Sequence, residues 1–243
     1  MRNSSTLLVN LRLVFFTAAF IHLLIAAAVI FSIDMSDDPD PRVSAYIFVR
    51  WRLITCWFNL ISIAYMPICL YCDWKEKQGH ADCTRVAATR KVRDLILTSI
   101  LFPITMFADT LFWRLWYKDN GLIAPVRVFD YLPGWAHHSL HTVSMLVVVL
   151  DLLLVPRRRP RSLLPGLALL VTFLTVYTAV LIWSYNNGAA VYSVFEMFES
   201  HKLLLLILYS YIECLFHYMS QWCIVDLVWG RRVSTEDTHS KVH

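Results

Sequence analysis

The sequence predicts an all-helical protein that spans a membrane six times, and two observations support this fold class. Hydrophobic residues make up 58% of the 243 residues and charged residues 16%, with a mean hydropathy of +0.54. Soluble domains are less apolar and about 25% charged. A bilayer core about 30 Å thick needs roughly 20 apolar residues of helix, and runs of that length recur along the whole chain.

The predicted spans lie at about residues 13–33, 47–72, 95–117, 134–155, 163–184 and 203–229. The first is longer than the apolar region of a signal peptide and other spans follow it, so we interpret it as a retained helix. A basic loop separates the second from the third. The fourth begins with "PGWAHHSLHT", and "PRRRPR" separates it from the fifth. The sixth follows "WSYNNGAAVY" and ends before "GRR". We expect one transmembrane domain over residues 1–230 and a disordered cytosolic tail over residues 231–243.

Lys and Arg predict the orientation, because short loops rich in these residues stay on the cytosolic side. The second loop, the fourth loop and the tail contain most of them: Lys75, Lys77, Arg85, Arg90, Lys91, Arg93, Arg157, Arg158, Arg159, Arg161, Arg231, Arg232 and Lys241. Both termini are therefore expected in the cytosol. The net charge of +4 fits this membrane topology, and no nucleic-acid partner is expected.

Polar residues inside the apolar spans are the functional candidates, since an ionisable group in lipid is costly unless it is paired or faces a cavity. With this topology and the rise of an α-helix, Thr55 is predicted roughly 13 Å, Asp109 roughly 12 Å and His141 roughly 10 Å from the same membrane surface. A hydroxyl, a carboxylate and an imidazole are thus expected in one layer of the non-cytosolic leaflet.

Neighbouring residues extend this candidate site, because helical positions three and four apart share a face. Arg52 and Asn59 flank Thr55, and His137 and His138 precede His141. Simpler interpretations exist: a membrane threonine often bonds its own i−4 carbonyl, Asp109 and Arg52 could form a structural ion pair, and the first two histidines could lie at the interface.

Three chemistries fit these residues. In acyl transfer, Thr55 would attack an ester carbonyl and His141 would act as general base. In a haem-binding electron-transfer protein, His22 and His217 would supply the axial ligands from facing helices. In an ion transporter, Glu213, His217 and Asp226 of the sixth span would mark the path. A non-enzymatic lipid-binding protein is a further alternative.

Two longer stretches resemble the family of the androgen-induced gene and androgen-dependent TFPI-regulating proteins. They are "WRLITCWFNL" (residues 51–60) and "LFPITMFADTLFWRLWYKDNGLIAPVRVFDYLPGWAHHSLHT" (residues 101–142). The resemblance implies a multi-pass membrane threonine hydrolase that cleaves fatty acid esters of hydroxy fatty acids. It also implies that Thr55, in a W-x-x-x-T pattern with Trp51, is the nucleophile.

The same resemblance implies that His141 is the catalytic base. The family pattern P-x-W-x-x-H-x-x-H-T is matched by Pro133, Trp135, His138, His141 and Thr142. The chain departs from the family at Asp109, where relatives have an apolar residue.

We therefore expect an intramembrane lipid ester hydrolase with Thr55 and His141 as its catalytic pair. Five further residues are expected to support the site or bind substrate: Arg52, Asn59, Asp109, Trp135 and His138. No metal and no organic cofactor is required by this scheme. The expected partners are a lipid ester and the bilayer of the endoplasmic reticulum or plasma membrane, and the sequence leaves the oligomeric state open.

Overall fold

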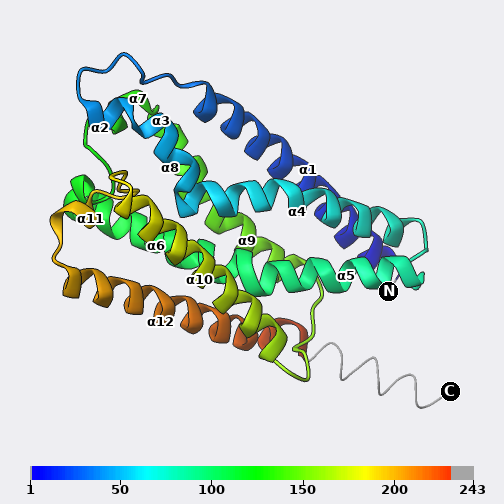
Figure 1. The fold of residues 1–243 in the computed structure, drawn as a ribbon. Coiled ribbons are helices and arrows are strands. Elements are labelled where there is room, and N and C mark those ends of the chain that lie inside the picture. The colour runs from blue at the N-terminus through cyan, green and yellow to red at the C-terminus, as the bar shows by residue number, and fades with distance from the viewer. Residues whose placement is uncertain (1, 231–243) are drawn as a thin grey trace.

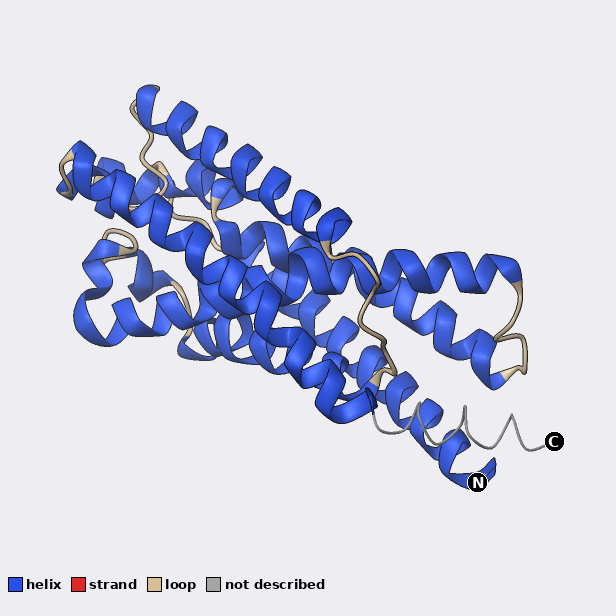
Figure 2. Ribbon diagram, turned by 90° about the horizontal axis from the view of Figure 1, so that it is seen from below, coloured by secondary structure: helices blue, strands red, loops and turns tan. Residues whose placement is uncertain are grey.

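The computed structural model describes residues 2–230, which form a bundle of long helices without strands in that range (Figures 1 and 2). Six segments of this range are long and apolar enough to cross a membrane, which confirms the predicted fold class. They are formed by α1 (Arg2–Ser32), α4 (Ile54–Lys77), α5 (Thr84–Ile96) with η2 (Leu97–Leu101) and α6 (Phe102–Asp119), α8 (Gly134–His138) with η4 (Ser139–Val143) and α9 (Ser144–Leu154), α10 (Leu164–Asn186), and α12 (Ser200–Val225) with η5 (Asp226–Gly230).

Short helices connect the spans on one side of the bundle: α2 (Pro41–Ser44), α3 (Tyr46–Val49), η1 (Arg50–Arg52), η3 (Asn120–Leu122), α7 (Val128–Tyr131) and α11 (Val194–Met197). Figure 1 places the start of α1 and the end of η5 at the opposite end of the bundle from these connections. An even number of spans explains why both ends of the described chain meet there. Which membrane side that is remains a prediction, and the predicted tail lies outside the described residues.

Three span boundaries differ from the prediction. The first span was expected from residue 13, but α1 begins at Arg2. The second span was expected from residue 47, but Leu53 adopts an extended backbone (φ −65°, ψ 139°) and α4 begins only at Ile54. The third span is longer than expected, because α5 continues the helix through charged residues. Hydropathy detects only apolar runs. It therefore detects neither the break at Leu53 nor the polar helix α5 that precedes the third apolar run.

The spans pack around a continuous apolar core in which α1 lies against α4 and α6 lies against α12. Large side chains from α4 and α6, such as Phe58 and Ile104, are completely buried. The outward faces of α1, α10 and α12 expose Leu, Ile and Phe side chains, including Phe216. Such an apolar outer surface suits lipid, which solvates it without cost, whereas water would not.

The connections on the side of the short helices are joined by a polar cluster. The Asp38 carboxylate accepts hydrogen bonds from Arg127 Nε (2.7 Å) and from the Tyr131 hydroxyl (2.6 Å). Burial alone would raise the pKa of Asp38, but the bonds from Tyr131 and Arg127 outweigh it and hold the pKa below its ordinary value. Asp38 is therefore ionised at neutral pH, and the cluster ties the first loop to the third.

A second polar cluster lies at the other end of the bundle, where the chain leaves α9. Arg157 is buried and donates to the Asp151 carboxylate (2.7 Å) and to its backbone carbonyl (2.8 Å). The Tyr65 hydroxyl donates to the other oxygen of Asp151 (2.6 Å). The fourth loop is thus attached to α4 and α9 through a buried, fully bonded carboxylate.

Arg157→Ala is expected to lower the free energy of unfolding by about 3–5 kcal/mol, because it leaves the Asp151 carboxylate buried without its cation. Arg158→Ala is the matched control, since Arg158 is exposed and an exposed side chain changes stability by only about 0.5 kcal/mol or less. Chemical unfolding of the purified protein in detergent micelles measures both variants. Equal stability of the two variants would contradict the structural role of Arg157.

Candidate active site

Thr55 is the second residue of α4, and this position leaves its hydroxyl free. The extended Leu53 precedes the helix, so no helical i−4 carbonyl lies within reach of the Thr55 side chain. In the described part of the chain the Thr55 hydroxyl has no hydrogen-bond partner. The simplest interpretation of a membrane threonine, a bond to its own helix, therefore does not apply here.

Two tyrosines organise the first turn of α4. The backbone N–H of Ile54 donates to the Tyr192 hydroxyl (3.0 Å), and the hydroxyls of Tyr192 and Tyr177 are 2.9 Å apart. Tyr177 in turn donates to the Arg52 carbonyl (3.1 Å). Burial raises the pKa of Tyr192, so it remains protonated and can donate to Tyr177. This chain of bonds connects α10 and the fifth loop to the start of α4.

His141 belongs to the fourth span, at a point where the helix widens into the π-helical turn η4. Such turns occur often at functional sites. His141 Nδ1 lies 3.0 Å from Asp109 Oδ1, and the Ser144 hydroxyl lies 2.6 Å from Asp109 Oδ2. Asp109 is completely buried in α6, and no Arg or Lys among the described residues forms an ion pair with it.

The arrangement suits a neutral His141 that donates from Nδ1. An ionised Asp109 accepts at Oδ1 from the His141 Nδ1–H and at Oδ2 from Ser144, whose hydroxyl also lies 2.6 Å from the Leu140 carbonyl. His141 Nε2 then keeps its lone pair, as a general base requires.

Aromatic side chains hold the ring of His141 in place. Phe112 stacks on the imidazole with a centroid distance of 3.5 Å and an interplanar angle of 7°. His137 lies one helical turn earlier, is buried, and packs against Trp116 at 4.6 Å. His137 therefore packs inside the bundle and shares the inward face with His141, whereas His138 is exposed.

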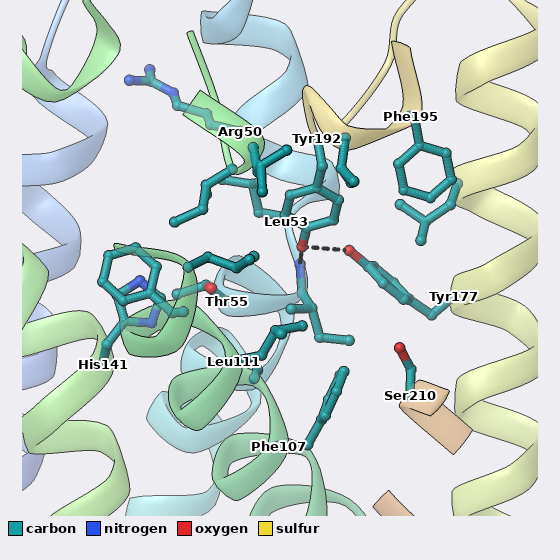
Figure 3. A pocket seen from close by; sticks show the side chains of 18 of the residues that line it. Arg50, Leu53, Thr55, Phe107, Leu111, His141, Tyr177, Tyr192, Phe195 and Ser210 are labelled. Atoms are coloured by element: carbon teal, nitrogen blue, oxygen red, sulfur yellow. Dashed lines mark hydrogen bonds between the residues drawn. The ribbon is translucent and has the colours of Figure 1, made fainter. Parts of the chain in front are cut away.

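Thr55 and His141 line one apolar cavity of about 260 Å³ between α4, α6, α10 and α12, and Figure 3 shows them on the same side of it. Tyr177 and Ser210 line the opposite part of the cavity, and Tyr192 lies between, next to the start of α4. The part of the chain that the structure describes has no direct hydrogen bond between Thr55 and His141. Catalytic hydrogen bonds often tighten only when substrate binds, so this arrangement is compatible with a nucleophile and its base.

The supporting residues expected from the sequence lie in different places. Asn59 is buried and donates from Nδ2 to the Thr55 carbonyl (2.9 Å), while its Oδ1 has no partner among the described residues. His138 is exposed and bonds Thr142 (3.2 Å). Trp135 is 47% exposed and does not line the cavity.

Arg52 and Asp109 do not form the ion pair that was one interpretation of the sequence. Arg52 donates to the Ser184 hydroxyl (2.8 Å) and lies over the ring of Trp183 at 5.0 Å. Since α4 begins only after Leu53, Arg52 belongs to η1 and not to the helix face of Thr55. It joins the start of α4 to the end of α10.

The residues of the alternative sites lie in different surroundings. His22 and His217 belong to α1 and α12, which lie on opposite sides of the bundle in Figure 1. Glu213 pairs with Arg114 (3.2 Å) and Asp226 with Arg159 (3.6 Å). No group of three or more His, Cys, Asp or Glu within residues 2–230 could hold a metal ion.

Three site residues were not expected from the sequence: Ser144, Tyr177 and Tyr192. Ser144 follows His141 by three residues, so the shared helix face was a usable signal. The two tyrosines have no such signal, because their role depends on contacts with a segment more than 120 residues earlier.

Fold and site together define a multi-pass helical membrane protein in which a threonine hydroxyl and a histidine, itself bonded to a carboxylate, line one apolar cavity. The model of the FAR-17a/AIG1-like protein family matches residues 12–222, and the chain belongs to this family.

Similar proteins include the androgen-dependent TFPI-regulating protein of Mesocricetus auratus, which is 33% identical over 72% of this chain and 74% of that protein. The human protein of that name is 31% identical over 65% of this chain and 68% of its own length. Human androgen-induced gene 1 protein is 24% identical over 79% of this chain and 82% of its own length. No solved structure matches the chain.

Proposed function

We propose that this protein is an intramembrane hydrolase of lipid esters, with Thr55 as nucleophile and His141 as general base. The observation that carries the proposal is that the unbonded Thr55 hydroxyl and the buried His141 imidazole line the same apolar cavity. The resemblance to threonine hydrolases of fatty acid esters of hydroxy fatty acids supports the same two roles for Thr55 and His141. An apolar cavity inside a membrane bundle suits a substrate that arrives from the lipid.

The reaction has two steps. His141 Nε2 takes the proton of the Thr55 hydroxyl while Oγ1 forms a bond to the ester carbonyl carbon. The bond from this carbon to the alcohol oxygen then breaks, and His141 returns the proton to that oxygen. Water, activated by His141, attacks the acyl-threonine ester next. An acid leaves, and the Thr55 hydroxyl is restored.

Negative charge develops on the carbonyl oxygen in both steps, and the start of α4 offers a place for it. The N–H groups of Thr55 and Cys56 lie in the first helical turn, where amides have no acceptor within the helix. Donors of this kind stabilise an oxyanion in acyl transfer. We propose these two amides as the oxyanion donors.

The proposed nucleophile can be tested with a fluorophosphonate probe, which transfers its phosphoryl group to an activated hydroxyl with loss of fluoride. Mass spectrometry of the labelled protein is expected to find the modification on Thr55, and Thr55→Ala is expected to prevent it. A protein that only binds lipid would not react. Labelling of another hydroxyl, such as Ser210, would contradict the assignment of the nucleophile.

We propose that Asp109 positions the His141 ring. Two substitutions separate the effect of its hydrogen bond from the effect of its carboxylate charge. Asp109→Val leaves the His141 Nδ1–H without an acceptor, so kcat is expected to fall by about 100-fold or more with KM unchanged. Asp109→Asn can still accept at Oδ1 and donate to Ser144, so it is expected to retain roughly a tenth of the activity or more. Steady-state kinetics of the two purified variants measures this. Full activity in Asp109→Val would rule out the positioning role.

A further inference from the structure

The polar side chains that line the cavity of Thr55 and His141 form two groups, those with a hydrogen bond to the protein and those without. The bonded ones are Arg50, His141, Tyr177, Thr178, Tyr192, Ser210 and Tyr211. In the described part of the chain, no hydrogen bond is formed by the side chains of Thr55, Tyr46 and His137. Thr55 is the proposed nucleophile, so the unused bonding capacity of Tyr46 and His137 requires its own explanation.

Tyr46 and His137 line this cavity at the end of the bundle that has the short connecting helices. His137 is the fourth residue of α8, so the helix rise places it roughly 4.5 Å from the start of that span, one turn before His141. Tyr46 is the first residue of α3, and Figure 1 shows α3 and α8 at this same end. The exposed fractions of Tyr46 and His137 are 8% and 6%. Both side chains are therefore buried between the water at this end of the bundle and the proposed catalytic pair.

Aromatic rings surround His137 without giving its nitrogens a partner. The imidazole centroid lies 4.6 Å from that of Trp116, 5.7 Å from that of Phe129 and 6.1 Å from that of Phe112. The unbonded polar atoms that the described protein encloses completely include neither nitrogen of His137 nor the Tyr46 hydroxyl, so these groups face open space in the cavity. A buried polar group is unfavourable without a hydrogen bond. Their partner is therefore a molecule that enters the cavity.

The proposed hydrolysis consumes water, and an apolar cavity holds water only where polar groups bind it. A buried water makes about two to four hydrogen bonds. An imidazole and a phenol hydroxyl each donate and accept, so His137 and Tyr46 supply such bonds. A smaller apolar cavity of about 70 Å³ between α1, α4 and η4 also reaches Thr55, but His141, which activates the water, does not line it. The larger cavity is therefore the route of the water.

We infer that His137 and Tyr46 bind the water that hydrolyses the acyl-threonine. This inference rests on the proposed ester hydrolysis and concerns its second step alone, because the first step uses no water. A water bound at His137 passes to His141, whose Nε2 takes one of its protons while the water oxygen forms a bond to the acyl carbon. The bond from this carbon to Thr55 Oγ1 then breaks, and the proton moves from His141 to Oγ1. The acid leaves.

His137→Phe tests this role, because phenylalanine keeps an aromatic ring among the neighbouring rings and removes both nitrogens. With 4-nitrophenyl octanoate, the purified variant in detergent micelles is expected to release nitrophenol in a burst. Hydrolysis of the octanoyl-threonine should then be about tenfold or more slower than in wild type. Mass spectrometry of the intact protein is expected to find octanoyl-Thr55. His137→Gln can still donate and accept, so it should stay within about threefold of wild type.

A product ratio gives a second measurement, which does not depend on the folded fraction of a variant. Added 1-butanol competes with water for the octanoyl group, and its apolar chain suits the cavity without a polar partner. The ratio of butyl octanoate to octanoic acid is expected to rise about tenfold in His137→Phe and about threefold or more in Tyr46→Phe. Tyr211→Phe is the matched control, since it removes a cavity hydroxyl that is paired with Thr178. Its ratio should stay within about twofold of wild type.

The outcomes separate this inference from the proposed function. An unchanged product ratio in His137→Phe, or an equal rise in Tyr211→Phe, would overturn the water site and leave the hydrolysis in place. Slower fluorophosphonate labelling of Thr55 in His137→Phe would overturn it as well, because a residue of the second step alone does not affect that reaction. If the wild-type protein neither hydrolyses the ester nor forms octanoyl-Thr55, the proposed function fails and the inference fails with it.

Discussion

Thr55→Ala is expected to abolish ester hydrolysis, with a fall in kcat of at least about 1,000-fold. The hydroxyl is the only group in the scheme that can form the acyl-enzyme bond, so nothing replaces it in the variant. Folding should be preserved, because the Thr55 hydroxyl makes no hydrogen bond in the described chain. The backbone carbonyl that accepts from Asn59 also remains. Release of free fatty acid from a lipid ester by the purified variant measures the effect.

Thr178→Ala is a matched control for this experiment. Thr178 lines the same cavity from α10, and its hydroxyl lies 3.4 Å from that of Tyr211. Removing it takes one hydroxyl from the same compartment without touching the proposed nucleophile, so activity should stay within about threefold of wild type. Retained turnover in Thr55→Ala, or an equal loss in Thr178→Ala, would exclude Thr55 as the nucleophile.

His141→Ala is the second substitution with a large expected effect, a loss of about 100- to 10,000-fold in kcat, which is the usual contribution of a general base. Thr55 would then have no acceptor for its proton, and the leaving alcohol no donor. Because the imidazole is buried against Phe112, the variant leaves a space of its own size. Added free imidazole is therefore expected to restore part of the activity.

His138→Ala separates this role from a general need for histidines in the segment. His138 is exposed and contacts Thr142 and Trp113, so its loss should cost far less activity than the loss of His141. Hydrolysis rates of the two variants, measured at equal protein concentration, give the comparison. Equal losses would indicate a role shared by both imidazoles, and the proposed mechanism would have to be abandoned.

The sequence was most informative where a local pattern has one physical meaning. Six apolar runs predict six spans because a helix in lipid must cover the whole apolar thickness with apolar side chains. The common depth of Asp109 and His141 followed from span direction and helix rise alone, and the two side chains are hydrogen-bonded. The rise per residue along the helix axis was therefore enough to predict that Asp109 and His141 lie at the same level of the bundle.

The same reasoning failed where the local backbone departs from a regular helix. The second span was treated as continuous from residue 47, which put Arg52 on the face of Thr55 and suggested an ion pair with Asp109. The extended backbone at Leu53 ends that continuity, so Arg52 lies against Trp183 and Ser184. Arg50 and Arg52 lie just before the break, but hydropathy averaged over a whole span does not register them.

For the three histidines, too, the sequence predicts one part and the packing determines the other. The sequence indicated that this segment is functional and selected His141, but it assigned His137 to the interface. His137 and His141 differ by four residues and share the inward face, while His138 lies off it. Only the packing of Phe112, Trp116 and Phe129 around this face determines which imidazoles are buried.

Hydropathy, helix rise and short motifs are properties of neighbouring residues, so they predict the membrane architecture, the family resemblance and the catalytic pair that we propose. Three features appear only when the helices are packed: the bond between Asp109 and His141, the anchoring of α4 by Tyr192, and the two unequal cavities that meet at Thr55. These features depend on how separate helices rotate and pack against one another. Such contacts join residues far apart in the chain, and no local pattern specifies them.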